Sequence, residues 1–172
     1  EGISHEAASF AGHLGLGKLI VLFDDNHISI DGPTELSVSD DQITRFQSYS
    51  WHTQAIDGHD PEAVVEAIAA AQDSDRPSLI ACRTTIGFGA PTKAGTAAAH
   101  GAPLGEDEIA GAREALGWPH APFHIPDDIL AAWRAAGSRG AVQSAAWNEK
   151  FATVNSTARS DFERALKGAL PD

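Results

Sequence analysis

The sequence predicts an α/β fold in which a parallel sheet carries helices on both faces, followed by a helical C-terminal segment. Apolar runs without polar alternation, such as residues 19–23, are typical of strands that are covered on both sides. Helices and strands alternate from residue 4 to residue 84, which favours parallel strands joined by right-handed crossovers. After Gly105 only helical patterns follow.

The first half of the chain contains six expected elements. In order, they are a helix over residues 4–14, a strand over 19–23, a helix over 40–49, a strand over 51–56, a helix beginning at 60 and a strand over 77–84. Ser4 can cap the first helix with its hydroxyl, and Gly15 ends it. The third helix begins at Asp60-Pro61, because an aspartate cap followed by proline at the first helical position is a strong start signal.

The second half of the chain begins with a long loop and continues as helices. Residues 85–104 are too rich in Gly, Pro and Ala for another element, and loops of this length are usually functional or disordered. Helices are then expected over residues 106–116, 126–135, 141–154 and 160–170. The stretch Gly137-Ser138-Arg139-Gly140 is interpreted as a short turn or linker.

The chain is acidic, and its size fits one sizeable core. Its 172 residues are 42% hydrophobic, and 12 Lys and Arg against 24 Asp and Glu give a formal charge of −12. This charge repels nucleic acid and anionic membranes, so neither is an expected partner. No apolar stretch approaches the roughly 20 residues of a membrane span, and no signal peptide is recognised, which favours a cytoplasmic protein.

The single cysteine and the first residue each lead to one expectation. Cys82 cannot form an internal disulfide and lies in an apolar run, so it is interpreted as a buried small hydrophobic residue rather than a nucleophile. The chain contains no Met and opens at Glu1, a residue before which an initiator Met would persist. Residue 1 is therefore not expected to be the biological start.

Polar residues follow the first expected strand. In an open parallel sheet, ligands bind outside the carboxyl ends of the strands. Here that end carries Asp24, Asp25 and Asn26, whose oxygen atoms suit a hard cation such as Mg²⁺. From the residues alone, a solvated turn is the more frequent outcome of such a sequence.

The loop after the third strand holds further candidates. Gly87 and Gly89 could let the backbone approach a ligand closely, although a flexible turn is an equal alternative. His100 can donate a hydrogen bond to a phosphate or move a proton near neutral pH. The chain has 8 histidines, and position alone does not distinguish His100 from a solvated loop histidine.

Ordered blocks of the sequence resemble one known family. Residues 1–32, EGISHEAASFAGHLGLGKLIVLFDDNHISIDG, are similar to the thiamine-diphosphate motif of transketolases, beginning just after its Gly-Asp-Gly. Later blocks follow in the same order at residues 49–52 (YSWH), 56–60 (IDGHD), 85–89 (TIGFG), 93–96 (KAGT), 100–104 (HGAPL) and 147–151 (WNEKF). The resemblance covers essentially the whole chain, and the ordered set is far more specific than any one motif.

The resemblance implies a thiamine-diphosphate-binding fold of which this chain is a part. Residues 1–118 would be the later half of the diphosphate-binding domain. Residues 119–172 would be a helical segment that leads to a pyrimidine-binding domain outside the chain.

The resemblance also implies the residues that hold the cofactor and its metal. Asn26 would give its side-chain oxygen, and Ile28 its backbone carbonyl, to the Mg²⁺ that grips thiamine diphosphate, a place that Ca²⁺ or Mn²⁺ can also take. The Asp of the Gly-Asp-Gly motif, a third metal ligand in the family, is not in the chain.

Four further positions match residues around the cofactor. Ile30 and Ile86 would pack near the thiazolium ring, and Gly87 would also contact the cofactor. His100 would have both a catalytic and a cofactor-binding role, because it would donate to the diphosphate or to the polar end of the substrate.

The reaction implied is the transfer of a two-carbon ketol unit from a ketose phosphate to an aldose phosphate, as in the pentose phosphate pathway and the Calvin cycle. Glu1 and Glu6 match acids near the interface of a homodimer, where they are thought to link the two active sites. Two positions depart from the family: His27 stands where relatives often have Gly or Lys, and Ala97 stands where some carry another active-site His.

Three alternatives remain at this point. The chain could belong to a transketolase-like partner or regulatory subunit without activity of its own. It could belong to a related thiamine enzyme, dihydroxyacetone synthase or phosphoketolase, which shares much of the scaffold. A generic nucleotide-binding module is disfavoured, because no Gly-x-Gly-x-x-Gly fingerprint follows a strand.

Overall fold

The computed structural model describes residues 2–171. The chain divides into two compact units, Glu1–Pro119 and His120–Asp172, which are described here one at a time. Among residues 2–171, no helix combines the length and the apolar character needed to cross a membrane.

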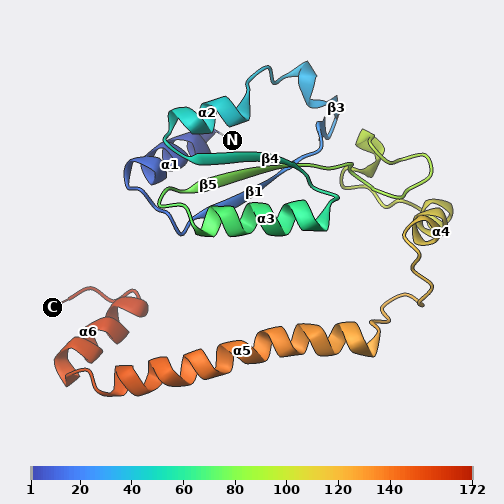
Figure 1. The fold of residues 1–172 in the computed structure, drawn as a ribbon. Helices are drawn as coiled ribbons and strands as arrows, with labels where there is room; N and C mark the ends of the chain where they lie inside the picture. Colours follow the sequence, from blue (N-terminus) through green and yellow to red (C-terminus); the bar gives the residue numbers. More distant parts are fainter. Residues whose placement is uncertain (1, 172) are drawn as a thin grey trace. The chain divides into compact units, whose positions relative to one another are not determined.

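A three-stranded parallel sheet forms the centre of the first unit (Figure 1). Its strands are β1 (Ile20–Asp25), β4 (His52–Asp57) and β5 (Ser78–Arg83), in the spatial order β1-β5-β4. The strands are in register, so that Asp25, Arg83 and Asp57 lie side by side at the carboxyl ends. The predicted parallel sheet is confirmed, and β5, the last strand in the sequence, is the central one.

Two helices cover one face of this sheet. They are α1 (Gly2–His13) and α2 (Gln42–Ser48). Ala8 of α1, Trp51 and Leu79 belong to the buried cluster on this face. The indole Nε1 of Trp51 donates to the carbonyl oxygen of Ala8 at 2.8 Å, so its one polar atom is satisfied inside the core.

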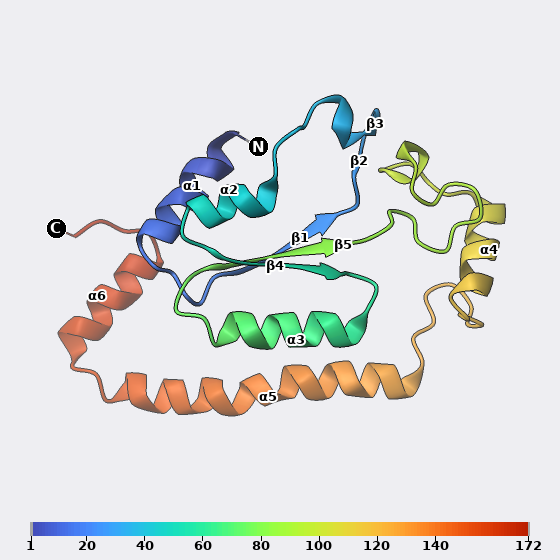
Figure 2. The same ribbon diagram turned by 45° about the horizontal axis from the view of Figure 1, so that its top comes forward.

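The helix α3 (Pro61–Gln72) covers the opposite face (Figure 2). The carboxylate of Asp60 accepts hydrogen bonds from the amides of Glu62 and Ala63, as the predicted helix start requires. Ala67, Ala71, Ile80 and Cys82 form the buried cluster on this side. The expectation of helices on both faces of the sheet is therefore confirmed.

Cys82 is 7% exposed within this second cluster. Burial raises the pKa of its thiol, and the negative charge of Asp24 raises it further. A raised pKa keeps the thiol protonated and unreactive. The interpretation of Cys82 as a small buried hydrophobic residue is confirmed.

A hairpin and several short elements surround the carboxyl ends of the strands. The hairpin consists of β2 (Ile28–Ser29) and β3 (Gly32–Pro33), and η1 (Thr34–Leu36) follows it. Its two-residue strands were not predicted, because they are too short for periodicity to reveal. The loop after β5 contains one 3-10 turn, η2 (Ala97–Ala99), and leads to α4 (Glu106–Ala115).

The second unit consists of two helices, α5 (Asp127–Ala152) and α6 (Ser156–Leu166). The turn expected at Gly137-Ser138-Arg139-Gly140 is wrong, because α5 continues through it. Each glycine costs a helix only about 1 kcal/mol relative to alanine, and the alanine-rich flanks compensate for that cost. The helix α6 begins four residues earlier than residue 160, because Asn155 caps it by accepting from the amide of Ala158 at 2.9 Å.

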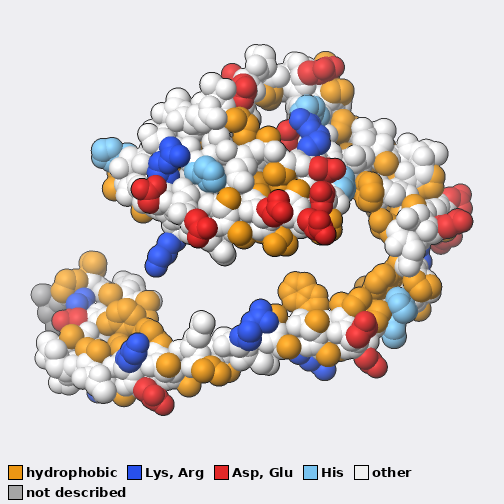
Figure 3. All heavy atoms as spheres, in the orientation of Figure 1, with side chains coloured by type: hydrophobic (Ala, Val, Ile, Leu, Met, Phe, Trp, Pro, Cys, Tyr) orange, Lys and Arg blue, Asp and Glu red, His pale blue; other side chains and the backbone are white. Residues whose placement is uncertain are grey.

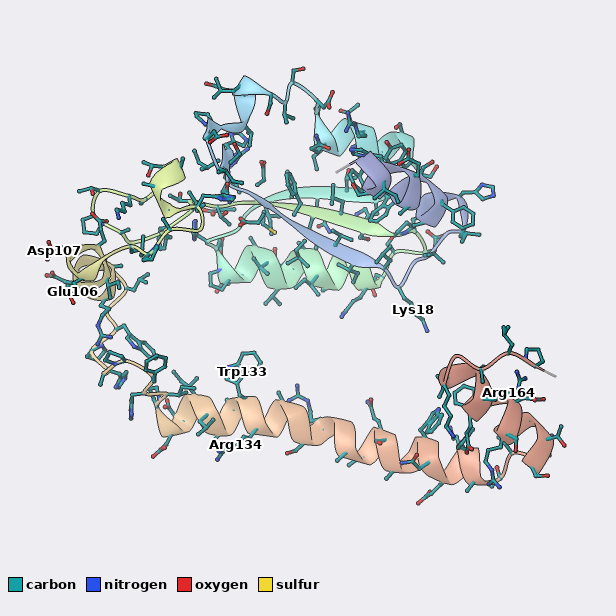
Figure 4. All side chains as sticks on the ribbon, turned by 180° about the vertical axis from the view of Figure 1, so that it is seen from behind. Lys18, Glu106, Asp107, Trp133, Arg134 and Arg164 are labelled. Carbon is teal, nitrogen blue, oxygen red and sulfur yellow. The ribbon has the colours of Figure 1, made fainter. Side chains whose placement is uncertain are left out.

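Aromatic rings hold α5 and α6 together. Trp147 stacks on Phe151 with a 4.8 Å centroid distance, and Phe151 and Phe162 are 5.3 Å apart. Elsewhere on these helices hydrophobic side chains lie at the surface (Figure 3). Trp133, for example, projects from α5 and is 75% exposed (Figure 4).

Candidate functional site

The three parallel strands end at one edge of the sheet, beside the β2–β3 hairpin and the loop after β5 (Figure 2). A groove with a volume of about 1970 Å³ runs along the sheet and reaches this edge. Asn26, Ile28 and His100 all line it, together with His59 and Thr85. The structure therefore brings three of the predicted site residues to one groove, although His100 is 74 residues from Asn26 in the sequence.

The turn after β1 holds the side chain of Asn26 in one orientation. Its Oδ1 accepts a hydrogen bond from the amide of Ile28 at 2.9 Å, and its Nδ2 donates to Oδ2 of Asp24 at 3.2 Å. An amide oxygen has two lone pairs, so Oδ1 retains one for a second partner. The arrangement fits the predicted role of Asn26 as an oxygen ligand to a cation.

The two aspartates of this turn tie β1 to β5. Asp24 accepts a hydrogen bond from the hydroxyl of Thr84. Asp25 pairs with Nη2 of Arg83 at 2.8 Å, and Nη1 of Arg83 donates to the Asp25 carbonyl oxygen at 3.1 Å. Among residues 2–171, no three His, Cys, Asp or Glu side chains gather as a metal site.

His27 has a backbone conformation that few residues adopt. Its φ is +61°, in the left-handed region that favours glycine. Its Nε2 lies 3.3 Å from Oδ1 of Asp25, and its side chain is 62% exposed. A residue with a Cβ is therefore held in an unfavourable backbone conformation at position 27.

The loop after β5 is fixed by hydrogen bonds rather than being a flexible turn. The amide of Gly95 donates to the carbonyl oxygen of Ile86 at 2.8 Å. The amide of Ala90 donates to the carbonyl oxygen of Gly87 at 2.9 Å. Gly87 has a φ of +64°, and a Cβ added there would lie 2.9 Å from the methyl group of Ala99. Both facts require glycine at position 87.

Glu108 of α4 fixes the middle of the same loop. Its Oε2 accepts from the amides of Thr92 at 3.1 Å and Lys93 at 3.3 Å, and its Oε1 accepts from the Thr92 hydroxyl. These hydrogen bonds from Thr92 hold the pKa of the Glu108 carboxyl below its ordinary value. Nζ of Lys93 donates to the Leu104 carbonyl oxygen at 2.7 Å, so the segment that carries His100 is held on both sides.

The other predicted site residues lie elsewhere. Ile86 and Gly87 lie in the fixed loop, next to the groove residue Thr85 but not among the described lining residues. Ile30, at the tip of the β2–β3 hairpin, is 73% exposed and does not line the groove either. Glu6 lies on the exposed side of α1, beside a separate pocket of about 540 Å³, and Glu1 lies outside the described residues.

His59 is a groove residue that the sequence analysis did not single out. Its Nε2 accepts a hydrogen bond from the amide of Thr85 at 2.9 Å, and its ring stacks on Phe88 with a 4.1 Å centroid distance. In the sequence it closely follows the expected strand 51–56, as His27 follows the strand 19–23, and it lies in the block 56–60 that resembles the family. The hydrogen bond between His59 and Thr85 depends on β4 and β5 being neighbours, which the sequence alone does not predict.

Comparisons with known proteins agree with this geometry. The family described as transketolase, thiamine diphosphate binding domain, matches residues 1–171. Transketolase 2 of Escherichia coli is 55% identical over 99% of the chain, and transketolase 1 of Vibrio cholerae is 56% identical over 99%. In both cases the chain spans 26% of the relative's length.

Solved structures show the same similarity in three dimensions. Transketolase from Leishmania mexicana superposes with a TM-score of 0.89 at 37% identity, over 100% of this chain and 27% of that one. Transketolase from Pichia stipitis in complex with sedoheptulose-7-phosphate gives a TM-score of 0.88 at 38% identity, over 100% of this chain and 26% of that one. The sheet, the groove and the family match lead to one conclusion: the chain belongs to the transketolase family, and its residues 1–171 match the thiamine diphosphate binding domain of that family.

Proposed function

We propose that the chain is part of a transketolase that moves a two-carbon ketol unit from a ketose phosphate to an aldose phosphate. The observation that carries the proposal is the meeting of Asn26, Ile28 and His100 on one groove in a chain that matches the thiamine diphosphate binding domain. When bound, thiamine diphosphate supplies the electron sink for cleavage of the carbon–carbon bond. The residues of this chain bind and orient the cofactor and the substrate.

Asn26 and Ile28 hold the divalent cation, Mg²⁺ with Ca²⁺ or Mn²⁺ as substitutes. The fixed Asn26 amide supports this assignment, because its Oδ1 faces the turn with one lone pair remaining. A hard cation takes oxygen ligands, and its charge offsets that of a diphosphate. His27, which lies between the two proposed ligands, has a φ of +61°, and unusual backbone conformations of this kind are concentrated at binding sites.

His100 acts at the polar end of the site as a hydrogen-bond donor to the diphosphate or the substrate and as a catalytic residue. It is exposed on the groove, where a phosphate can reach it. Ile30 and Ile86 supply apolar walls near the thiazolium ring, and Gly87 allows close approach of the backbone. The 73% exposure of Ile30 supports this role, because a large apolar side chain at a hairpin tip is free to contact a ligand.

The two compact units correspond to two parts of the complete enzyme. Residues 1–118 form the later half of the diphosphate-binding domain, and residues 119–172 lead to the pyrimidine-binding domain. The division of the chain after Pro119 supports this boundary. The enzyme is a cytoplasmic homodimer with Glu1 and Glu6 near its interface, and the exposed apolar residues Ile3 and Phe10 on α1 beside Glu6 support a protein contact there.

A matched pair of neighbouring substitutions tests the site. In the full-length gene product, Asn26→Ala is expected to raise the concentration of Mg²⁺ and thiamine diphosphate needed for half-saturation by at least about tenfold, because a metal ligand is removed. His27→Ala is expected to change it little, since that side chain points to Asp25. Isothermal titration calorimetry measures both, and equal losses would contradict the assignment.

The same titration, combined with an assay of ketol transfer, separates the remaining alternatives. Residues 1–172 alone are expected to bind the cofactor very weakly, because a metal ligand and half of the cleft are outside the chain. Tight one-to-one binding by these residues would overturn that expectation. A full-length protein that binds cofactor but transfers no ketol unit would be a regulatory or partner subunit, and a different acceptor preference would indicate dihydroxyacetone synthase or phosphoketolase.

A further inference from the structure

The loop after β4 approaches the end of β5 unusually closely. The amide of Gly58 donates to the carbonyl oxygen of Arg83 at 2.8 Å. A Cβ added to Gly58 would lie 2.6 Å from the Thr84 methyl group and 3.0 Å from the Arg83 carbonyl oxygen. Only glycine permits this approach, and the approach brings the next residue, His59, against the start of the loop after β5.

Three interactions hold His59, two of them through its ring. Its Nε2 accepts from the Thr85 amide at 2.9 Å, its face stacks on Phe88 at an interplanar angle of 25°, and its own amide donates to Oδ1 of Asp57 at 2.9 Å. A backbone amide can only donate, so Nε2 carries no proton and the neutral ring has its proton on Nδ1. His59 therefore acts as a fixed acceptor for the backbone of Thr85.

We infer that His59 is a positioning residue, which holds the turn from Thr85 to Phe88 at the groove. The turn contains Ile86 and Gly87, and the inference rests on the proposed function, in which these two residues contact the cofactor. The bond from the Gly95 amide to the Ile86 carbonyl oxygen fixes one side of the turn, and His59 fixes the other. With both sides fixed, little ordering of the loop remains to oppose ligand binding.

Two variants of the full-length gene product separate the role of Nε2 as a hydrogen-bond acceptor from the role of the ring in stacking, and a third variant is the control. His59→Phe keeps a ring to stack on Phe88 but has no acceptor for the Thr85 amide. His59→Gln loses the ring but places an amide oxygen near the position of Nε2. His124→Ala is the matched control, since His124 is an exposed histidine of the second unit whose ring contacts that of His120.

The first measurement is amide hydrogen exchange in the cofactor-free protein. Exchange across residues 85–88 is expected to become roughly tenfold faster in His59→Phe, the factor that loss of one hydrogen bond typically produces. It is expected to stay near the unsubstituted rate in His59→Gln and His124→Ala. Unchanged exchange in His59→Phe would overturn the inference, whether or not the protein is a transketolase.

The second measurement is cofactor binding by calorimetry. His59→Phe is expected to need about tenfold more thiamine diphosphate for half-saturation, and His59→Gln is expected to restore most of the affinity. Equal affinity of His59→Phe and the unsubstituted protein would overturn the inference. If the unsubstituted protein itself binds no thiamine diphosphate, the proposed function fails, and the exchange measurement still decides the role of His59.

Discussion

The two compact units of the chain are held together in different ways. In Glu1–Pro119, buried clusters lie on both faces of the sheet, and residues 78–82 of the central strand are all buried. In residues 120–171, no described residue is buried, and Trp133 and Val142 are each 75% exposed. The second unit relies on local interactions, such as the Asn155 cap and the rings of Trp147, Phe151 and Phe162.

The first unit is therefore ordered by tertiary packing, and the second by local interactions along and between its helices. The backbone of the first unit is determined by packing, so its loops can hold side chains such as Asn26 and His59 in place for a ligand. Helices gain most of their stability in proteins from burial of an apolar face. Trp133 and Val142 of α5 are not covered within the second unit, so burial contributes little to the stability of this helix in the described residues.

The largest expected effect on stability comes from removing Trp51, a tryptophan that is buried in the first unit. Trp51 is 3% exposed and donates to the Ala8 carbonyl oxygen, so Trp51→Ala is expected to lower the free energy of unfolding by about 3–5 kcal/mol. In residues 1–172 alone, Trp133→Ala is the matched control, expected to change the free energy of unfolding by less than about 0.5 kcal/mol because Trp133 is largely exposed there. Urea denaturation followed by circular dichroism measures both, and a large loss from Trp133→Ala would contradict the comparison.

Glycine substitutions sharpen the comparison at the level of the backbone. A Cβ on Gly12 would lie 1.8 Å from the Tyr49 carbonyl oxygen, so Gly12→Ala is expected to cost about 1–3 kcal/mol of stability by forcing α1 away from residue 49. Nothing lies within 4 Å of a Cβ on Gly137, so Gly137→Ala in α5 is expected to stabilise the helix by about 0.5–1 kcal/mol. Thermal melting measures the two changes, and the same sign for both would be the contradicting result.

The smallest expected effect is a dependence on pH in the first unit. The folded pKa of Glu108 is lowered by its bonds to Thr92, so its contribution to stability is fully present above the ordinary carboxyl pKa of about 4.3 and disappears as pH falls through the lower folded value. The difference in unfolding midpoint between the unsubstituted chain and Glu108→Gln is expected to be largest near neutral pH and to shrink in acid. A difference that does not vary with pH would rule out the carboxylate as its cause.

Much of the fold follows from local patterns. The apolar run at residues 19–23, the cap at Asp60 and the proline at Pro61 each predict an element that the structure contains, because periodicity and capping act over a few residues. The turn predicted at residues 137–140 is wrong, because it is also inferred from a few neighbouring residues. Two glycines in a short window indicate a break, but the helix propensity of the many alanines around them outweighs that local signal.

The candidate site is divided between local and long-range features. Asn26 and Ile28 could be named from the sequence, because residues 1–32 resemble a known cofactor-binding motif. His59 could not, because its contact with Thr85 joins residues that are 26 positions apart.

The sequence by itself determined the fold class, the family and the turn that is proposed to hold the cation, because each of these can be recognised from periodicity, caps and motifs within short segments. Only the tertiary structure decided the strand order β1-β5-β4 and the close approach of Gly58 to β5. These depend on which apolar faces pack together across the whole unit. Packing of this kind is a property of the folded chain that no single segment specifies.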